Sequence, residues 1–483
     1  MDEKIEYPVE NTSSYIATSS LAERDAAVVW HPFTQHYTAP FSIPIGRGEG
    51  AYLYDDSGKR YIDAISSWWV NLHGHSHPYI AQKVAEQFLK LEQVIFAGFT
   101  HEPAVRLAER LLEILPKNQG KIFYSDNGST AVEVALKMAI QYFHNQGFTK
   151  KRKVIALENG YHGDTFGTMA VGAKSAFNAP FEGFLYETIY LPTPTKGQEQ
   201  NALNQMKALM RNADEIACFI FEPLIQGAGG MVMYEPEILE ELLTLAKENE
   251  VLTIADEIMT GFGRTGKMFA TDYVETKPDI LCLSKGLTGG AMALGVTSCT
   301  QEIYEAFLSE DRKKTLFHSH SFTANPLACT SGLASLDLLL TKETDNKILN
   351  INRLHSKFKK KILGNVVGGD TNHGAEYLVD EDTNLGAMNM VGLGDLVNTN
   401  HGTVHPKITD IRIQGTILAI ELYTPEGTSY FSNIRDITYQ FFIEKGILIR
   451  PLGNVIYLLP PYCISEEDLS YIYFCIEEFL ERI

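Results

Sequence analysis

Three short apolar runs, each followed closely by a charged residue, most strongly limit what this chain can fold into. The runs span residues 217–221, 251–255 and 280–283, and they lead to Glu222, Asp256 and Lys285. Their apolar residues follow one another without alternation, which predicts strands buried on both faces of a sheet. In open α/β sheets, ligands bind outside the carboxyl ends of the strands. The sequence therefore predicts an α/β protein in which these three charged residues line one pocket.

The chemistry of such a pocket depends on the lysine. A lysine at the rim of a buried sheet is partly desolvated, which lowers the pKa of its ammonium and makes the amine a possible Schiff-base nucleophile. Lys285 in an isolated Ser-Lys-Gly would more often be a surface residue. An acid on a neighbouring strand end changes that interpretation, because pyridoxal phosphate needs both a lysine and a carboxylate that keeps its pyridine nitrogen protonated. Asp256 supplies that acid.

A second feature predicts a site for a phosphate group. A strand at 121–124 meets a turn of small polar residues that contains Gly128 and Ser129, and a long amphipathic helix follows to about residue 143. Free backbone N–H groups and the helix dipole make such a helix start an anion-binding site. The spacing of Thr130 and Glu133 also predicts a capping box, which is compatible with a phosphate role.

Further polar clusters follow other predicted strands and loops. A strand at 153–156 leads to Tyr161, His162 and Asp164, where the aromatic ring could stack on a planar cofactor. The segment 318–326 is rich in hydroxyl groups and suits a second phosphate contact. Residues 261–266 match G-x-G-x-x-G, but no long helix is predicted to follow, so a dinucleotide site is disfavoured. Arg264 in that loop is expected to face the substrate instead.

Composition excludes several classes of protein. The 483 residues carry a net charge of −19, which argues against nucleic acid as a partner because phosphate contacts need clustered Lys and Arg. The six cysteines show no paired short spacing, and we expect reduced thiols in a cytoplasmic protein. The amino terminus lacks the apolar core of a signal peptide, and no apolar run is long enough for a membrane span. The histidines at 73, 75 and 77 lack nearby Cys or carboxylate partners, so no metal is expected.

The rest of the chain predicts how the domains are organised. Residues 1–25 are expected to form a loosely held arm, 50–65 a hairpin, and 79–91 and 105–115 helices. Residues 364–405 are rich in turn signals and predict an irregular insertion. Near the carboxyl end we expect a strand at 416–422, a helix at 438–444, and a hairpin of strands at 446–450 and 455–459. The expected domains are an amino-terminal segment 1–75, a large domain 76–340 and a small domain 341–483.

Seven motifs together give a family resemblance that covers residues 30 to 462 except the 364–405 region. They are WHPFTQ (30–35), SSWW (66–69), NGYHGDTFG (159–167), EPLIQGAGGM (222–231), ADEIMTGFGRTGKMF (255–269), SKGLTGG (284–290) and IRPLGNVIYLLPPY (449–462). The chain resembles the class III aminotransferases of the fold type I pyridoxal phosphate enzymes. Within them it is similar to the branch that acts on 8-amino-7-oxononanoate in biotin biosynthesis. The implied fold is a large domain with a mostly parallel sheet flanked by helices, plus a small α+β domain.

The resemblance also implies roles for individual residues. Lys285 would carry the cofactor, Asp256 would pair with its pyridine nitrogen, and Tyr161 would stack on its ring. The implied cofactor contacts are Gly128, Ser129, Tyr161, His162, Glu222, Asp256, Lys285, His320 and Ser321, the last serving the neighbouring subunit of a homodimer. The implied substrate contacts are Phe33, Trp68, Trp69, Tyr161, Asp164, Arg264, Ser319 and Arg450.

The implied reaction moves an amino group from S-adenosyl-L-methionine to 8-amino-7-oxononanoate through pyridoxal 5'-phosphate. Lysine as the amino donor and an ω-amino acid aminotransferase remain alternatives that the sequence leaves open. A non-catalytic regulator that binds the cofactor is disfavoured, because the short acidic amino terminus offers no DNA-binding segment.

Overall fold

The central element is a seven-stranded sheet in the order β4-β12-β11-β10-β7-β5-β6. The structure is a computed structural model that describes residues 20–364, 407–425 and 427–483. The pairings among β11, β10, β7, β5 and β6 are parallel, whereas β12 runs antiparallel to both of its neighbours. In sheet order the strands are Gln119–Ser125, Gly295–Thr300, Ile280–Leu283, Leu252–Asp256, Ile216–Phe221, Lys153–Leu157 and Thr188–Leu191. The predicted α/β class with a mostly parallel sheet is confirmed.

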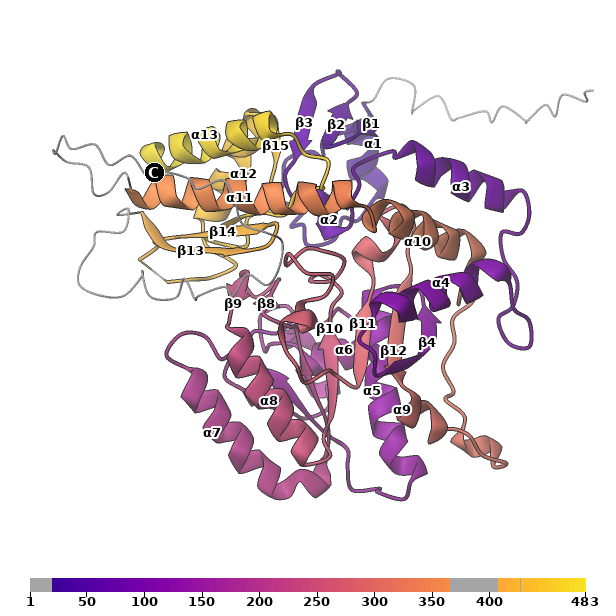
Figure 1. Ribbon diagram of the computed structural model, residues 1–483. Helices are drawn as coiled ribbons and strands as arrows, with labels where there is room; N and C mark the ends of the chain where they lie inside the picture. Colours follow the sequence, from indigo (N-terminus) through magenta and orange to yellow (C-terminus); the bar gives the residue numbers. More distant parts are fainter. Residues whose placement is uncertain (1–19, 365–406, 426) are drawn as a thin grey trace, which may run out of the picture.

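Both faces of this sheet are covered by helices, which explains the uninterrupted apolar strands. In β7 all six residues are buried, and they are divided equally between two cores. Phe219 and Phe221 face the core that contains α4 (Glu102–Ile114), α7 (Glu199–Leu209) and α8 (Pro236–Glu248). Cys218 and Ile220 face α5 (Gly128–Asn145). Figure 1 shows α7 and α8 together on one side of the sheet.

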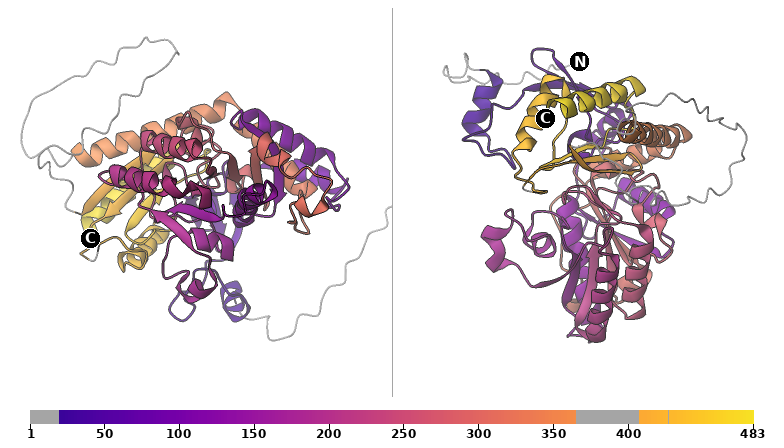
Figure 2. Two further views of the ribbon diagram at one scale, coloured as in Figure 1. Left: turned by 90° about the horizontal axis from the view of Figure 1, so that it is seen from below. Right: turned by 90° about the vertical axis from the view of Figure 1, so that its left-hand side faces the viewer.

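Two smaller sheets lie at one end of the large one, above it in Figure 1. A four-stranded sheet has the order β1-β2-β3-β15, and a three-stranded sheet has the order β13-β14-β16. The strands are Ile45–Glu49, Tyr52–Asp55, Arg60–Asp63, Ile447–Leu448, Ile408–Gln414, Ile417–Leu422 and Val455–Leu458. Helices α11 (Lys342–Gly364), α12 (Ile434–Glu444) and α13 (Glu466–Arg482) pack with them, as the right-hand view of Figure 2 also shows.

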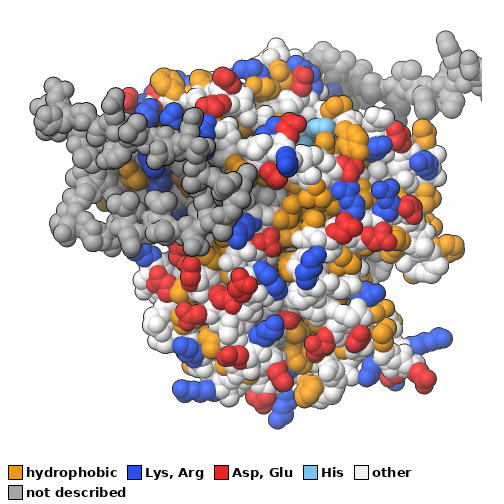
Figure 3. All heavy atoms as spheres, in the orientation of Figure 1, with side chains coloured by type: hydrophobic (Ala, Val, Ile, Leu, Met, Phe, Trp, Pro, Cys, Tyr) orange, Lys and Arg blue, Asp and Glu red, His pale blue; other side chains and the backbone are white. Residues whose placement is uncertain are grey.

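The remaining described elements connect these parts. A two-stranded sheet, β8 (Ile225–Gln226) and β9 (Val232–Met233), follows β7. The other helices are α1 (Leu21–Val28), α2 (Ser66–Trp69), α3 (Pro78–Phe88), α6 (Phe166–Val171), α9 (Gln301–Glu305) and α10 (Pro326–Leu339). None of the helices in the described ranges is both long and apolar enough to span a membrane. On the described part of the face in Figure 3, acidic and basic side chains are interspersed.

The predicted local elements are largely present, with one error in strand pairing. The hairpin at 50–65 is confirmed by the antiparallel pairing of β2 with β3. The carboxy-terminal hairpin is wrong, because β15 pairs in parallel with β3 and β16 pairs antiparallel with β14. Apolar periodicity predicts that a strand exists but not which strand it pairs with. Most of the predicted arm and nearly all of the irregular insertion lie outside the described residues.

Gly415 lies where the three-stranded sheet packs against the loop that carries Arg264. It has a φ of +58°, and a Cβ atom there would lie 2.2 Å from the carbonyl carbon of Thr265. The turn between β13 and β14 therefore packs directly on the backbone of the loop that carries Arg264, whose carbonyl oxygen accepts a hydrogen bond from the Thr416 N–H at 2.9 Å. Only glycine fits this approach.

We expect Gly415→Ala to lower the free energy of unfolding by about 2–4 kcal/mol, because it combines left-handed backbone strain with a backbone clash. Urea unfolding followed by circular dichroism measures the change. Gly58→Ala is the matched control, since Gly58 has a φ of +88° and its Cβ would meet no described atom within 4 Å. The control should lose only about 1–2 kcal/mol. Equal losses in the two variants would contradict the packing argument.

Candidate active site

The ends of three neighbouring strands meet at one cavity of about 570 Å³. Glu222 follows β7, Asp256 ends β10, and Lys285 lies two residues beyond β11. Because these strands run in parallel and lie side by side, their carboxyl ends reach the same edge of the sheet. All three side chains line the cavity, as the sequence predicts.

A buried ion pair lies at the floor of the site. His162 Nδ1 is 2.7 Å from Asp256 Oδ2, and the Ile258 N–H donates to Asp256 Oδ1 at 3.1 Å. Burial alone would lower the pKa of His162, but its hydrogen bond to Asp256 and the charges of Asp256 and Glu222 outweigh burial and raise it. Two hydrogen bonds therefore hold the Asp256 carboxyl group in one orientation at a buried position.

Glu222 connects two loops around the cavity. Its carboxylate accepts hydrogen bonds from the backbone N–H of Tyr161 and of Gly227, both at 2.9 Å. Burial raises the pKa of Glu222 to about 7 despite the opposing effects of His162 and these hydrogen bonds. Glu222 thereby fixes the start of the segment that carries Tyr161, which also lines the cavity.

Lys285 begins a single 3-10 turn, Lys285–Thr288, in a left-handed conformation with a φ of 46°. Its Nζ lies 4.4 Å from the centre of the Trp69 ring. Burial lowers the pKa of Lys285 to about 8, and the carboxylates of Asp256 and Glu222 offset only part of this effect. The amine is thus partly deprotonated near neutral pH, which suits a nucleophile or a general base.

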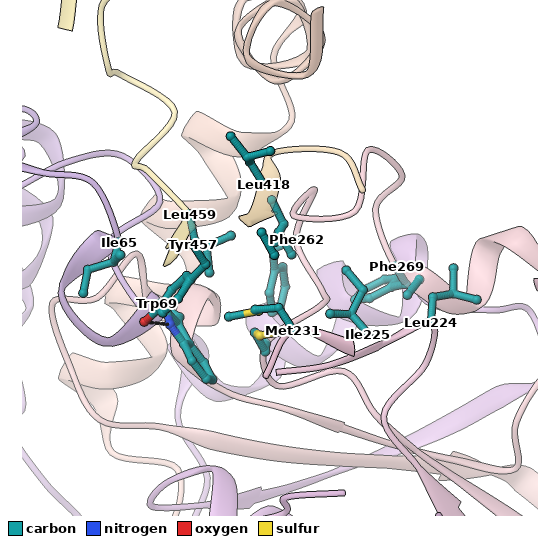
Figure 4. Packing of buried hydrophobic residues seen from close by; sticks show 14 of the residues in the cluster. Ile65, Trp69, Leu224, Ile225, Met231, Phe262, Phe269, Leu418, Tyr457 and Leu459 are labelled. Carbon is teal, nitrogen blue, oxygen red and sulfur yellow. Dashed lines mark hydrogen bonds between the residues drawn. The ribbon is translucent and has the colours of Figure 1, made fainter. Parts of the chain in front are cut away.

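The two adjacent tryptophans have different environments. Trp69 is buried, and its Nε1–H donates to the hydroxyl of Tyr457 at 2.9 Å, which is the dashed line in Figure 4. Trp68 is 43% exposed, and Arg450 Cζ lies 5.0 Å from the centre of its ring. Both tryptophans and Arg450 line the cavity. An apolar wall therefore ends at a guanidinium that has no ion-pair partner in the described part of the chain.

The amino end of α5 also borders the cavity, through Asn127, Gly128 and Ser129. The predicted capping box of Thr130 with Glu133 is wrong. Asn127 is the cap: its Oδ1 accepts from the Thr130 N–H, and its own N–H donates to Thr130 Oγ1, both at 3.0 Å. Glu133 instead accepts from the Gly167 N–H at 2.9 Å and so holds the next loop.

Two groups of predicted contacts do not line the cavity. Arg264 is buried beside it, with Nη1 donating to the Pro460 carbonyl at 2.8 Å and Nη2 to the Trp69 carbonyl at 3.4 Å. Ser319 and Ser321 are exposed, and His320 Nε2 lies 2.9 Å from His318 Nε2. These residues are absent from the wall formed by the described chain.

The remaining predicted contacts, Phe33, His162 and Asp164, do line the cavity. Several other residues also line it without having been predicted, and they include Asn127, Phe177, Tyr430 and Tyr457. The cap preference of asparagine could have indicated Asn127. Phe177 and Tyr430 belong to none of the motifs, and only the fold brings them here.

The rings of His73 and His77 are in contact, with centres 6.2 Å apart, whereas His75 has a separate partner. The expectation that these histidines lack a carboxylate partner is wrong for His75. His73 Nε2 lies 3.1 Å from Ser335 Oγ, and His75 Nε2 lies 2.8 Å from Asp63 Oδ2. Within the described ranges no group of three or more His, Cys, Asp or Glu side chains could hold a metal ion.

The site has the groups that pyridoxal phosphate requires. A partly deprotonated amine, a carboxyl group hydrogen-bonded to a buried histidine and the amino end of an 18-residue helix border one cavity. In addition, His162 Nε2 is buried with no partner among the described residues, which leaves a polar atom to satisfy a bound group. The residues therefore fit this cofactor.

Comparison with known proteins places the chain in a family. The family described as aminotransferase class-III matches residues 33–364. An adenosylmethionine-8-amino-7-oxononanoate aminotransferase of Synechococcus elongatus is 43% identical, over 94% of this chain and 99% of its own. A crystal structure of the enzyme of that name from Methanocaldococcus jannaschii has a TM-score of 0.82 and 35% identity, covering 96% of this chain and 98% of its own.

An omega transaminase from Pseudomonas jessenii, solved in complex with PMP, has a TM-score of 0.81 at 25% identity and covers 96% of this chain and 98% of its own. These likenesses confirm the predicted fold type I architecture. With a family match over more than half of its residues, the chain belongs to the class III aminotransferases.

Proposed function

We propose that this chain transfers an amino group from S-adenosyl-L-methionine to 8-amino-7-oxononanoate, with pyridoxal 5'-phosphate as cofactor, in biotin biosynthesis. The observation that carries the proposal is the cavity in which Lys285, Asp256 and an apolar wall ending at Arg450 meet. The names and near full-length coverage of the relatives support the choice of substrates.

The cofactor supplies an electron sink that stabilises negative charge on a substrate carbon. Lys285 would hold it covalently, and the Asp256 carboxylate, oriented by His162, would hold a proton on the ring nitrogen. Tyr161 would stack on the ring, with its backbone fixed by Glu222. Gly128 and Ser129 at the start of α5 would bind the phosphate through backbone N–H groups.

Lys285 would also move the proton of the reaction. When not linked to the cofactor, the Lys285 amine would be free to move a proton at the reacting carbon. Because burial lowers its pKa to about 8, the amine can accept a proton from that carbon near neutral pH and return it to a different atom. The buried walls around Trp69 limit the access of water during this transfer.

The keto substrate is an apolar chain with a terminal carboxylate. Trp68 and Trp69 would contact the chain, and Arg450 would bind the carboxylate with two parallel hydrogen bonds. Arg264 is a weaker candidate, because two of its donors already bind backbone carbonyls. The likeness to an omega transaminase keeps an ω-amino acid aminotransferase as the second candidate function.

The assembly and location are part of the same proposal. Ser319, His320 and Ser321 do not line the cavity of their own chain, which supports a homodimer in which Ser321 contacts the phosphate of the neighbouring subunit. The division into segments 1–75, 76–340 and 341–483 would place the cofactor in the large domain. All six cysteines are free in the structure, which supports a cytoplasmic location.

An amino-donor screen with 8-amino-7-oxononanoate as acceptor tests the proposed reaction. We expect S-adenosyl-L-methionine to give the highest kcat/KM, with the diamino product measured by mass spectrometry. A higher kcat/KM with lysine than with S-adenosyl-L-methionine would identify lysine as the amino donor instead. A higher kcat/KM with pyruvate as acceptor than with the long keto acid would instead favour the second candidate function.

The lowered pKa of Lys285 predicts a pH profile. We expect the rate at which the Lys285 amine becomes covalently linked to added pyridoxal phosphate, followed by visible absorbance, to fall about tenfold per pH unit below pH 8 and to level off above it. At pH 7 about a tenth of an amine with a pKa of 8 is free, against roughly one in 2,500 of an ordinary lysine. Lys285→Ala should show no linkage at any pH. A profile that still rises above pH 10 would rule out the buried-amine explanation.

Arg450→Ala should raise the KM for 8-amino-7-oxononanoate about ten- to a hundredfold, because one charge-assisted interaction is lost. Cofactor absorbance should change little, since Arg450 is assigned to the substrate. Steady-state kinetics of Arg450→Ala and Arg264→Ala, compared side by side, measure the difference. A larger KM defect in Arg264→Ala, with Arg450→Ala silent, would reverse the assignment.

A further inference from the structure

Aromatic rings from four separate segments border the cavity beside Arg450. We call Phe33, Trp68, Phe177 and Tyr430 the aromatic rim, and all four line the cavity. The Phe177 ring centre lies 4.8 Å from that of Tyr430 and 5.9 Å from that of Phe33. The Phe33 and Trp68 ring centres are 5.6 Å apart. The rim is therefore a continuous series of ring contacts.

The rim is unusually open to solvent for such large apolar side chains. Phe33, Trp68 and Phe177 are 45%, 43% and 42% exposed. Single exposed aromatic side chains are normal, but a contiguous set beside a cavity is typical of a binding site. The position of the rim at the cavity wall indicates a ligand that enters the same site.

Phe177 lies on a turn that is held by local hydrogen bonds. Asn178 Nδ2 donates to the Ala173 carbonyl at 2.7 Å, and the Ser175 N–H donates to Asn178 Oδ1 at 2.9 Å. The Phe177 N–H donates to Ser175 Oγ at 3.2 Å. These local hydrogen bonds reduce the entropy that the ring would lose on contact with a ligand.

Tyr430 is held by a close backbone approach. Gly453 has a φ of +63°, and a Cβ atom there would lie 1.8 Å from the Ser429 carbonyl oxygen. The loop that carries Tyr430 therefore packs on Gly453, three residues after Arg450. The same substructure thus presents a guanidinium and an aromatic ring to one cavity.

The rim is suited to a cation. The faces of aromatic rings carry negative potential and attract a cation within about 6 Å of the ring centre. Arg450 already lies over Trp68, and Arg435 Cζ lies 5.5 Å from the Tyr430 ring centre. Among the described residues no Lys or Arg lies over Phe33 or Phe177. The carboxylate of Asp164 lines the same cavity and adds negative charge.

We propose that Phe177 and Tyr430, together with Phe33, bind the methylsulfonium group of the amino donor through cation–π contacts. The inference rests on the proposed function, because S-adenosyl-L-methionine is the donor that carries a sulfonium. A sulfonium has a permanent positive charge but no N–H or O–H group. It therefore cannot donate a hydrogen bond of that kind to an acceptor on the protein. Aromatic faces recognise such cations. Phe177 and Tyr430 therefore select the donor.

The test compares two ligands that differ by one methyl group and one charge. Calorimetry measures the dissociation constants of S-adenosyl-L-methionine and S-adenosyl-L-homocysteine for protein loaded with the amine form of the cofactor, with which a donor amine does not react. We expect the sulfonium to bind about tenfold more tightly than the neutral thioether. In Phe177→Leu the ratio of the two dissociation constants should fall to about two, because leucine keeps apolar volume but has no ring face.

Two control variants separate the ring from other effects. Phe181→Leu changes a 40% exposed ring that does not line the cavity, and it should leave the tenfold ratio unchanged. Asp164→Asn removes the nearby carboxylate. Melting temperatures of Phe177→Leu and Phe181→Leu should agree within a few degrees, since both rings are exposed to a similar degree.

A ratio near one in the unmodified protein would overturn the proposal. A tenfold ratio that persists in both Phe177→Leu and Phe33→Leu would also overturn it. The same holds for a ratio that falls to about one only in Asp164→Asn. A failure of the proposed function would appear separately, as no amino transfer to 8-amino-7-oxononanoate from any donor, whatever the binding ratio.

Discussion

The parallel pairing of β7, β10 and β11 is the constraint on which the site depends. It brings Glu222, Asp256 and Lys285 to one edge of a sheet in which β7 is entirely apolar and buried. Charged groups in such surroundings are costly unless they are paired. His162 offsets this cost for Asp256 by contact at 2.7 Å, whereas Lys285 responds with a lowered pKa. The same burial that stabilises the sheet thus makes the amine reactive.

Glu257, next to Asp256, shows how the neighbouring loop is fixed. Its fully buried carboxylate accepts from the Thr271 N–H at 2.7 Å, from Thr271 Oγ1 at 2.9 Å and from the Ala270 N–H at 3.1 Å. Burial raises the pKa of Glu257 to about 7. The two adjacent acidic residues therefore have different roles. Asp256 faces the cavity, whereas Glu257 holds the loop that carries Arg264. The sequence Asp-Glu alone does not indicate which of the two carboxylates faces the cavity.

The sequence predicts those features that depend on residues close together in the chain, and it fails for contacts between distant residues. The strand ends at Glu222, Asp256 and Lys285 follow from short apolar runs, and the structure brings them together. The cap of α5 was misassigned because Asn127 competes for the same N–H groups. The pairing of β15 with β3 and the arrival of Tyr430 beside Phe177 are tertiary, since they join residues hundreds of positions apart. Composition and periodicity contain no information on such contacts, and the roles of the site residues remain predictions.

The pairing of β15 with β3 has a consequence for how the protein is made. The Ile62 N–H donates to the Gly446 carbonyl at 2.8 Å, and the Tyr462 N–H donates to the Leu72 carbonyl at 2.8 Å. The segment that carries Trp68 and Trp69 is therefore held on both sides by residues that are synthesised much later than the segment itself. Contacts over such a sequence separation slow folding. The nascent chain can complete its large sheet early, but the wall that contains Trp68 and Trp69 can close only after residues 446–462 have been synthesised.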